Sequence, residues 1–576
     1  MTSYFNFLLF LLLIFIVSAF KKPPNIVLIV ADDLGWDDVS FHGSDQIPTP
    51  NIDALAFNGV ILNQHYTLAM CSPSRAALLT GKYPIHTGMQ HYVIQESEPR
   101  GLSLNETLLP QMLSKAGYES HIIGKWHLGM HKKEYTPLNR GFKSHYGFWQ
   151  GYHDYYSHFI NEINPPYDGY DMRRNMDVDW DSYGKYSTDI FTEEAVKTIN
   201  EHNKSNPLFL YIAHLAPHAG NKLTPCQAPL DLIDKFSYIE DPERQAYAAM
   251  MAKLDDSVGE VVSALKNNSM LANSVIIFIS DNGAPTVGFL RNKGSNFPFR
   301  GLKATAWEGA HRSVAAIWSS LIKKNHKVSD QLMHVVDWLP TICSLAGVDI
   351  TDLGTIDGID MWKAISKGGK SPRKELLYNI DDVESAYAAY RSGDWKYLVG
   401  YHTRNFMFND WYGNFTNSHD VKYNPVSVLN SKTGLAITKS AAKRNVKMFK
   451  KRRNKKKFGK KIKKLLLNVK IINRMRKEGM VRCNTEEYVS CDPSVKPCLF
   501  NLKDDPCERV NLAEANQDIV KELENSIKRY RSTMVNALNL GGDCRADPKF
   551  WNNTWTFWIS ELNENPKNIS CKYLKI

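Results

Sequence analysis

The run Asn25-Ile26-Val27-Leu28-Ile29-Val30-Ala31-Asp32-Asp33 decides how the rest of the chain is interpreted. Its apolar, largely β-branched residues are typical of a central strand of a parallel sheet, which is buried on both faces. Leu208 to Ala213 and Val275 to Ser280 repeat the pattern, and the second of these runs is followed by Asp281-Asn282-Gly283. The sequence therefore predicts a parallel sheet in which two strands end in acidic or amide side chains.

Helical patterns separate these strands, for example at Ser187 to Asn200 and at Asp241 to Leu265. Alternating strands and helices predict an α/β fold, in which ligands gather at the carboxyl ends of the strands. After about residue 370 the pattern changes to short alternating segments such as Ala386 to Tyr390 and Trp395 to Val399. We therefore expect a second, smaller region near the C-terminus.

Four oxygen donors fall at two of the predicted strand ends. Ca²⁺ and Mg²⁺ prefer such ligands, and a soft metal does not. Each pair alone is more typical of a helix N-cap or a solvated turn, but their shared position after parallel strands favours a metal site. The residues are Asp32, Asp33, Asp281 and Asn282.

The segment Cys71-Ser72-Pro73-Ser74-Arg75-Ala76-Ala77-Leu78-Leu79-Thr80-Gly81 predicts a turn followed by a short helix. Pro73 can open this helix in its first turn, and Gly81 can close it. The start of a helix presents free N–H groups and the positive end of its dipole, so an anion at residue 71 would be stabilised there. A buried or disulfide-bonded cysteine before an ordinary helix explains the bare Cys-x-Pro-x-Arg string equally well.

Further cationic candidates lie in three other segments. Lys125 and His127 are two residues apart in Gly124-Lys125-Trp126-His127-Leu128-Gly129, so an extended backbone would point both side chains the same way. A Lys and a His on one face can form an anion site, whereas a lone His is more often structural. His218 follows a predicted strand, and Lys303 lies between Arg300 and Gly309.

Taken together, these segments resemble the sulfatase family. Cys71 to Gly81 is similar to the sulfatase signature, in which the cysteine is oxidised to formylglycine and the hydrated aldehyde attacks sulfate esters. Gly124 to Gly129 is similar to the second signature of the family. The wider run from Cys71 to His91 most resembles the arylsulfatase B (N-acetylgalactosamine-4-sulfatase) branch, whose substrates are sulfated galactosamine residues of glycosaminoglycans.

The resemblance implies both a fold and a cofactor. The fold is α/β and alkaline-phosphatase-like, with a large, mainly parallel central sheet flanked by helices and a smaller C-terminal domain built on a four-stranded antiparallel sheet. One Ca²⁺ per chain would be held by Asp32, Asp33, Asp281 and Asn282, and it would also contact a formylglycine oxygen at position 71 (3-oxoalanine in place of Cys71).

By the same resemblance, Lys125, His218 and Lys303 bind the sulfate, and one of the last two can protonate the leaving oxygen as a general acid. One formylglycine hydroxyl attacks sulfur, expels the alcohol and leaves a covalent sulfated intermediate. His127 hydrogen-bonds the diol and acts as the base when this intermediate collapses, while Arg75 steadies the diol and the metal ligands.

The chain also departs from the family pattern. His218 is followed by Ala219-Gly220, where relatives often have an acidic residue and proline, and Trp307-Glu308-Gly309 is followed by alanine instead of a second glycine. The loop from Gln95 to Ser103 and the region after His158 lack cysteines that are associated with arylsulfatase B. Because these loops should shape the sugar pocket, the differences concern the substrate more than the chemistry.

The 576 residues, 43% of them hydrophobic, are typical of a globular chain with room for more than one domain. The apolar run from Phe5 to Phe20 is short for a membrane span and ends in small residues, so residues 1–19 are predicted to be a cleaved signal peptide. No later run is long and apolar enough to span a bilayer, so no transmembrane anchor is expected. We expect a catalytic domain at 20–372 and a C-terminal subdomain at 373–576.

Sequons and cysteines both fit passage through the secretory pathway to the lysosome or the extracellular space. The sequons begin at Asn105, Asn203, Asn267, Asn414, Asn552 and Asn568. Six of the nine cysteines, which predict a disulfide-stapled C-terminal region, are Cys483, Cys491, Cys498, Cys507, Cys544 and Cys571. Cys343 lies in an apolar run and is predicted to be a buried free thiol. A formylglycine-generating enzyme is an expected partner during secretion.

The net charge of +11 has a local origin. Lys439 to Lys477, within a predicted insertion at about 403–482, holds 19 Lys and Arg and no acidic residue, so the rest of the chain is net acidic. A solvated, flexible insertion and a docking segment for a sulfated polyanion such as a glycosaminoglycan explain this tract about equally well, and proteolytic clipping at its dibasic sites is a further alternative. Nucleic-acid binding fits the charge but conflicts with the signal peptide and the sequons, so no nucleic-acid partner is expected.

The sequence therefore predicts calcium-dependent hydrolysis of sulfate esters by an enzyme of the arylsulfatase type, on sulfated N-acetylgalactosamine of glycosaminoglycans. A phosphodiesterase or phosphatase of the same superfold is disfavoured, because such enzymes generally use Ser or Thr at position 71 and two metals. The remaining alternative is a non-catalytic protein that binds sulfated polyanions on a sulfatase fold. The presence of all the expected site residues argues against it.

Overall fold

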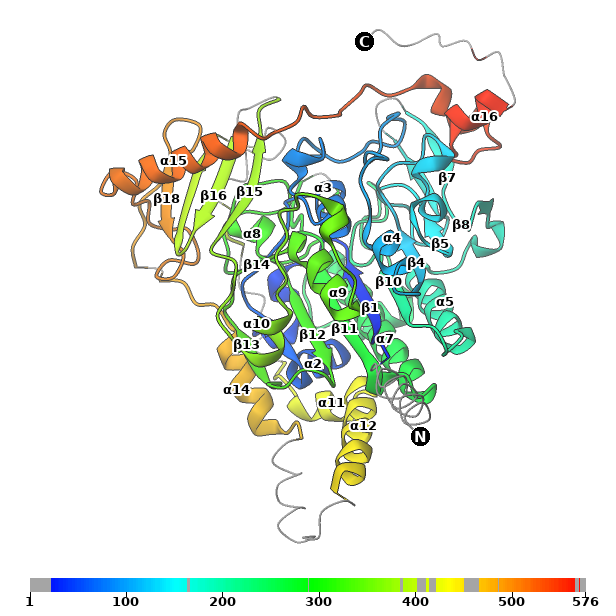
Figure 1. Ribbon diagram of the computed structural model, residues 1–576, viewed down its shortest axis with the longest axis horizontal. Coiled ribbons are helices and arrows are strands. Elements are labelled where there is room, and N and C mark those ends of the chain that lie inside the picture. The colour runs from blue at the N-terminus through cyan, green and yellow to red at the C-terminus, as the bar shows by residue number, and fades with distance from the viewer. Residues whose placement is uncertain are drawn as a thin grey trace, which may run out of the picture.

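The computed structural model describes most of the chain (Figure 1). The described residues are 22–162, 166–288, 290–383, 387–400, 411–413, 421–449, 466–484, 486–564 and 569, and the side chains of 441–449 are left out. The predicted signal peptide, residues 450–465 of the basic tract and the sequons at Asn414 and Asn568 lie outside these ranges, as does Cys571.

A ten-stranded sheet forms the centre of the molecule. The strands that position the site are parallel neighbours, in the order β11 (Ser274–Ser280), β1 (Asn25–Ala31), β10 (Leu208–Ala213), β4 (Glu119–Lys125) and β5 (Ser144–Phe148). The remaining strands are β2 (Val60–Leu62), β8 (Arg173–Arg174), β9 (Asp177–Val178), β12 (Ala315–Ser319) and β13 (Lys327–Ser329). β12 pairs antiparallel with both β11 and β2, so the sheet is mixed but mainly parallel, as predicted.

Helices cover both faces of this sheet, and every residue of β1 is therefore buried. Ile26, Leu28 and Val30 belong to the core on one side, under α3 (Cys71–Thr80), α4 (Leu109–Ser114) and α9 (Trp338–Ala346). The intervening residues Val27 and Ile29 belong to the core on the other side. The helices there are α2 (Pro50–Asn58), α5 (Ser187–Glu201) and α7 (Pro242–Asn267). This three-layer arrangement confirms the predicted α/β fold.

A separate sheet of four antiparallel strands follows the central one (Figure 1). Its strands are β15 (Glu375–Asp381), β16 (Tyr387–Ser392), β17 (Trp395–Val399) and β18 (Cys498–Asn501), and α15 (Gln517–Arg531) packs on β16 and β17. Disulfides Cys483–Cys507 and Cys491–Cys498 staple the segments around β18. Both the smaller antiparallel sheet and the disulfide-stapled C-terminal region are confirmed, and Cys343 is a buried free thiol as predicted.

The ends of the basic tract are folded against the body. α12 (Lys432–Phe449) packs on α7 and α2, and α14 (Val469–Gly479) packs on the short helix η2 (Ser40–His42). Figure 1 shows both helices at the end of the sheet opposite α3. Met475 of α14 is buried and Arg476 forms an ion pair with Asp45, so this part of the tract contributes to packing.

Four sequon asparagines lie within the described ranges, and each is exposed. They are Asn105, Asn203, Asn267 and Asn552. Within those same ranges, no helix combines the length and apolar character that crossing a membrane requires.

Further short elements complete the fold. The short strands are β3 (His65–Tyr66), β6 (Phe159–Asn161), β7 (Asp168–Tyr170) and β14 (Met333–His334). The short helices are α6 (Leu230–Ile233), α8 (Glu308–His311), α10 (Trp362–Lys367), α11 (Pro425–Asn430) and α16 (Trp558–Glu564).

Candidate active site

The carboxyl ends of β1 and β11 bring the predicted oxygen donors together. The Asp281 N–H donates to the carbonyl of Ala31 at 3.1 Å, and the Asp33 N–H donates to Asp281 Oδ1 at 3.2 Å. Asn282 Nδ2 donates to Asp33 Oδ1 at 2.6 Å. Asp33 has a φ of 61°, which is costly for a residue with a side chain and persists only where surrounding contacts enforce it. The strand ends thus hold these side chains in a fixed cluster.

Each carboxylate of the cluster is paired with a different cation. Lys125 Nζ lies 2.6 Å from Asp32 Oδ2, and Lys303 Nζ lies 2.6 Å from Asp33 Oδ1. The third pair joins the Arg75 guanidinium to Asp281 Oδ2 at 2.8 Å. The three carboxylates and the side chains of Lys125 and Arg75 are almost completely buried, so their charges are screened little by water.

These pairs favour the charged forms of Asp32 and Lys303. Burial alone would raise the pKa of Asp32, but Lys125, His218 and Arg75 outweigh burial and lower it. Burial would lower the pKa of Lys303, but Asp33 and then Cys71 raise it well above its ordinary value, so the ammonium group stays charged. Burial, and then the charge of Asp32, raise the pKa of Asp281 although Arg75 opposes the shift. The site therefore combines charged forms that are favoured at Asp32 and Lys303 with a carboxyl group at Asp281 that is easier to protonate.

Cys71 lies at the N-terminus of α3, the helix that Gly81 closes in the left-handed conformation with a φ of 70°, as predicted. The Cys71 thiol donates to Asp32 Oδ1 at 3.4 Å, and Lys303 Nζ donates to Cys71 Sγ at 3.3 Å. Burial, and then the negative charge of Asp32, raise the pKa of the thiol. The unmodified cysteine is therefore held as a neutral thiol and is a poor nucleophile.

The prediction of an extended backbone from Lys125 to His127 is wrong. β4 ends at Lys125, and His127 has a φ of 59°, so the two residues do not share an extended strand. The His127 N–H donates to the carbonyl of Trp149 at 3.0 Å, a tertiary contact that turns the chain and that local spacing does not reveal. The absence of a side chain at Gly151 leaves space for the His127 ring, since a Cβ on Gly151 would lie 2.9 Å from that ring. Both side chains still reach the site from different backbone conformations.

His127 is suited to accept a proton. Its Nε2 lies 3.1 Å from the carbonyl of Ile94 and must carry the hydrogen, because a carbonyl only accepts. Its Nδ1 is buried and has no hydrogen-bond partner in the described part of the chain. Burial, and then Lys125, lower the pKa of His127 well below its usual value, so the ring is a neutral base.

His218 approaches the cluster from the loop after β10. Its Nε2 lies 3.4 Å from Asp33 Oδ2, and its Nδ1 donates to the carbonyl of Ala219 at 2.7 Å. Burial lowers the pKa of His218, although Asp33 and Asp32 oppose this shift. All six residues predicted to act in catalysis therefore converge on one point: Cys71, Arg75, Lys125, His127, His218 and Lys303.

The donor set fits a hard divalent cation. Asp32, Asp33, Cys71 and His218 each offer a possible ligand atom, and these atoms lie within 4.8 Å of one another. Asn282 Oδ1 is buried without a hydrogen-bond partner among the described residues, as a waiting metal ligand would be. Carboxylate and amide oxygens favour Ca²⁺ or Mg²⁺. The oxygens of Asp281, another predicted ligand, contact Arg75 and the Asp33 N–H instead of the other donors.

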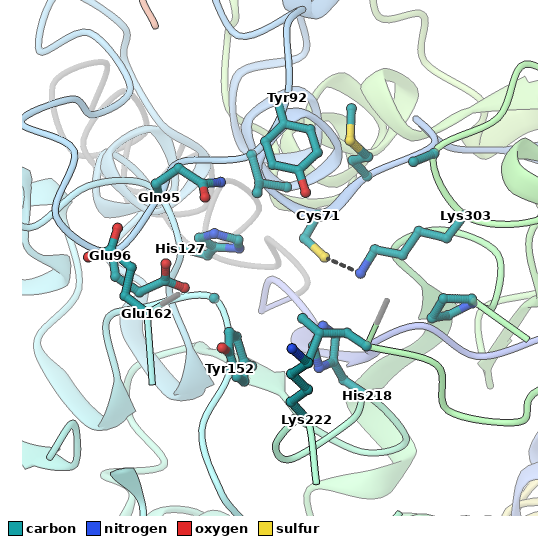
Figure 2. Close-up of a pocket in the computed structure, with 16 residues that line it drawn as sticks. Cys71, Tyr92, Gln95, Glu96, His127, Tyr152, Glu162, His218, Lys222 and Lys303 are labelled. Atoms are coloured by element: carbon teal, nitrogen blue, oxygen red, sulfur yellow. Dashed lines mark hydrogen bonds between the residues drawn. The ribbon is translucent and has the colours of Figure 1, made fainter. Parts of the chain in front are cut away.

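A cavity of about 810 Å³ opens beside Cys71. Figure 2 shows Lys303 pointing at Cys71 on one side of it, with Glu96 and Glu162 beyond His127 on the other. Sequence reasoning missed much of the lining, namely Tyr92, Gln95, Glu96, Tyr152, Glu162 and Lys222. In the sequence, the loop from Gln95 to Ser103 is notable only for its lack of cysteines. No local motif indicates that Tyr152, Glu162 or Lys222 lines a cavity.

Glu96 and Glu162 form an acidic end wall of this cavity. Glu162 Oε1 accepts a hydrogen bond from Ser97 Oγ at 2.9 Å, whereas Glu162 Oε2 is buried without a hydrogen-bond partner among the described residues. Burial raises the pKa of Glu96 to about 7, and burial together with Glu96 raises that of Glu162 to about 8. The wall can therefore accept hydrogen bonds from a polar ligand, and it gains negative charge as the pH rises.

Comparison with known proteins gives concordant matches. Residues 24–348 match the family model described as Sulfatase. The chain is 34% identical to arylsulfatase J of Mus musculus over 96% of this chain and 83% of that protein. It is 34% identical to N-acetylgalactosamine-6-sulfatase of Mus musculus over 62% of this chain and 69% of that protein. The crystal structure of Ps i-CgsB superimposes with a TM-score of 0.65 and 25% identity, covering 90% of this chain and 94% of that one.

Proposed function

The chain belongs to the sulfatase family and is a sulfuric ester hydrolase, and from this premise we propose that it removes sulfate from sulfated N-acetylgalactosamine residues of glycosaminoglycans. The similarity to a protein named N-acetylgalactosamine-6-sulfatase supports this sugar. The resemblance of the run from Cys71 to His91 to the arylsulfatase B branch supports the same sugar with sulfate on its 4-position.

The observation that carries the proposal is the meeting of Lys125, Lys303 and Arg75 with the buried carboxylates next to Cys71, beside a cavity large enough for a sugar. A sulfate ester is a dispersed anion with a poor alkoxide leaving group, so its hydrolysis needs positive charge, a positioned nucleophile and a proton donor. Residues of all three kinds lie at this point.

We propose that Ca²⁺ binds Asp32, Asp33, Asp281 and Asn282, and that Cys71 is oxidised to formylglycine by a formylglycine-generating enzyme. When present, the two groups would supply a Lewis acid for the sulfate and a hydrated aldehyde as the oxygen nucleophile. The Cys71 Sγ then stands for one formylglycine oxygen, so its contacts with Asp32 and Lys303 indicate which neighbours that oxygen would have.

The other residues hold charge or move protons. Lys125 and Lys303 are placed to bind sulfate oxygens, and Arg75 holds Asp281 in position. The bare Nδ1 of His127 can accept a proton from the nucleophile at residue 71. His218 and Lys303 both line the cavity beside Cys71, and we propose that one of them protonates the leaving oxygen.

The far end of the cavity would bind the sugar. Tyr152 and the carboxyl groups of Glu96 and Glu162 can hydrogen-bond to hydroxyl and amide groups. Lys222 lies beside His218 in Figure 2 and can meet an anionic neighbouring sugar. These contacts come from loops, so they can differ between relatives that share the chemistry.

We also propose that the protein passes through the secretory pathway to the lysosome or the extracellular space, with glycans on the exposed sequons. The division into a catalytic domain at 20–372 and a C-terminal subdomain at 373–576 remains our prediction, as does the docking of sulfated polyanions by the basic tract Lys439 to Lys477.

Mass spectrometry of the peptide that contains Cys71 tests the nucleophile, using protein secreted from cells that make formylglycine. We expect an aldehyde at this position and hydrolysis of a small aryl sulfate. Cys71→Ser should lose activity, and Cys343→Ala, which alters a remote buried thiol, should keep it. Unmodified cysteine in a host that converts a control sulfatase would refute the formylglycine proposal.

The sugar is tested separately with monosaccharides and terminal disaccharides that carry sulfate at known positions. We expect the highest kcat/KM on N-acetylgalactosamine sulfated at the 4-position. Strong hydrolysis of the aryl sulfate with a preference for another sulfated sugar would overturn the substrate and leave the sulfatase chemistry in place.

A further inference from the structure

A second cluster of metal-ligating side chains lies far from the active site. Glu119 and His121 are on the first half of β4, and His202 follows the last residue of α5. One possible ligand atom from each lies within 4.8 Å of the others. Lys125 reaches the active site from the opposite end of the same strand, about 20 Å away at 3.3 Å per residue.

His202 has the features of a ligand that is waiting for a cation. Its side chain is fully buried, and its Nε2 lies 3.0 Å from the carbonyl of Asn206. Since a carbonyl only accepts, Nε2 carries a hydrogen, and in the neutral ring Nδ1 is then the nitrogen with a free lone pair. This Nδ1 has no hydrogen-bond partner in the part of the chain that the structure describes. A backbone carbonyl that fixes the tautomer in this way is the usual support of a metal-bound histidine.

The bare nitrogen faces a carboxylate. His202 Nδ1 lies 3.8 Å from Glu119 Oε2, which is too far for a hydrogen bond. Glu119 Oε1 accepts a hydrogen bond from Asn206 Nδ2 at 2.8 Å, which fixes the orientation of the carboxylate. A cation between the two groups could be bound by both of them.

His121 completes the cluster from the same face of β4. Its Nδ1 lies 2.7 Å from Ser144 Oγ, which leaves Nε2 available. The neutral ring can therefore offer this nitrogen to a metal ion. Two imidazoles and one carboxylate suit Zn²⁺, whereas the oxygen-rich active site suits Ca²⁺.

We propose that Glu119, His121 and His202 bind one Zn²⁺, with water in the fourth position, and that the ion ties the end of α5 to β4. In a tetrahedral zinc site the ligand atoms lie about 3.4 Å apart, so the 3.8 Å between His202 Nδ1 and Glu119 Oε2 must close only slightly. Lys143 Nζ lies 3.1 Å from Glu119 Oε2 and competes with the ion. Lys143 is largely exposed, so it can swing away when zinc binds.

The test uses the full-length secreted enzyme, stripped of metal and then saturated with Ca²⁺ so that the active site is filled. Zn²⁺ binding is measured by calorimetry, and Co²⁺ binding by its visible absorption, which is intense in a tetrahedral site. We expect one such site in the wild-type protein. His202→Gln should weaken binding by about 10-fold to 100-fold. Lys143→Met should tighten binding several-fold, because Lys143 then no longer competes with the ion for Glu119.

His326→Gln serves as the matched control, since His326 is a half-buried histidine on another part of the surface and should leave the titration unchanged. If His202→Gln does not fold, His121→Gln, at a less buried position, provides the same comparison. Absence of a tetrahedral Co²⁺ site in the wild type, or binding that neither histidine substitution weakens, would overturn the proposal. A doubly protonated His202 ring in NMR spectra at pH 7 with Zn²⁺ present would do so as well.

Discussion

Replacement of Lys396 by methionine should destabilise the protein strongly. Lys396 lies on β17 with its side chain fully buried, and its Nζ is 2.7 Å from Glu508 Oε1 and 3.2 Å from Glu308 Oε1. Glu308 begins α8, a few residues after Lys303 of the active site. One ammonium group therefore joins the smaller sheet to the segment that carries Lys303.

The expected loss is about 3–5 kcal/mol at pH 8, because removing one member of a buried ion cluster leaves uncompensated charge in the interior. Methionine keeps most of the side-chain volume, so a cavity adds little. The double variant Lys396→Met/Glu508→Gln should recover part of the loss, because it also removes the carboxylate left without its cation.

The loss should depend on pH in a defined direction. Burial raises the pKa of Glu508 from 4.5 to about 7, so the folded state binds more protons than the unfolded state between these values. Stability from this group is complete below pH 4.5 and falls as the pH rises towards 7, by about 3 kcal/mol in total. Without Lys396 the pKa of Glu508 rises further, so the deficit of the variant should be at least about 1 kcal/mol larger at pH 8 than at pH 5.5.

Guanidinium unfolding followed by tryptophan fluorescence at both pH values measures the difference. Lys115→Met is the control, because Lys115 forms an ion pair of similar length, 2.8 Å, with Asp352 on the surface. That pair is exposed to solvent and should contribute little. A deficit below about 1 kcal/mol for Lys396→Met, or an equal deficit at both pH values, would show that the buried cluster does not carry the charge that we assign to it.

Three further predictions concern the active site. Arg75→Lys keeps the charge but not the paired contacts with Asp281, so kcat on an aryl sulfate should fall by about 100-fold; a near-normal rate would contradict the positioning role. Removal of Ca²⁺ with a chelator should abolish activity. Asn282→Ala should raise the Ca²⁺ concentration at which half of the activity is recovered by about 10-fold. An unchanged Ca²⁺ concentration would exclude Asn282 as a ligand. Burial raises the pKa of Glu162 to about 8, so this group gains negative charge as the pH rises and should then repel the anionic substrate. Glu162→Gln should therefore flatten the increase in KM between pH 6 and pH 9. A KM profile identical to that of the wild type would refute this.

The parts of the fold that could be predicted are those with a strong local signal. The run from Asn25 to Val30 is so uniformly apolar and β-branched that only a strand buried on both faces accommodates it, and β1 lies between two parallel neighbours. Cys71 and Gly81 could be placed at the two ends of a helix because capping depends on local backbone chemistry. The four-stranded C-terminal sheet was inferred from resemblance rather than from such a signal.

Features that depend on distant contacts were missed. The left-handed backbone of His127 follows from a hydrogen bond to Trp149, more than twenty residues away. The meeting of Ser97 with Glu162 joins residues 65 positions apart through loop packing, which no pattern in either segment predicts. Chemistry-bearing motifs were therefore visible in the sequence, while the wall that faces the substrate was not.

The two ends of the cavity, one beside Cys71 and one at Glu96 and Glu162, differ in charge. Three carboxylates and three cations are paired as Asp32 with Lys125, Asp33 with Lys303 and Asp281 with Arg75, so the formal charges of these six side chains cancel. A divalent cation in this cluster would then create a net positive charge that an anionic sulfate ester and a developing alkoxide can balance.

The opposite end of the same cavity carries the carboxyl groups of Glu96 and Glu162, which become negative as the pH rises. An anionic group on the substrate is attracted to the end beside Cys71 and repelled from the other end. The field along the cavity therefore orients a sulfated sugar with its sulfate towards Cys71. It also disfavours a second anionic group at the acidic wall, so the substrate that fits best presents hydroxyl or amide groups there.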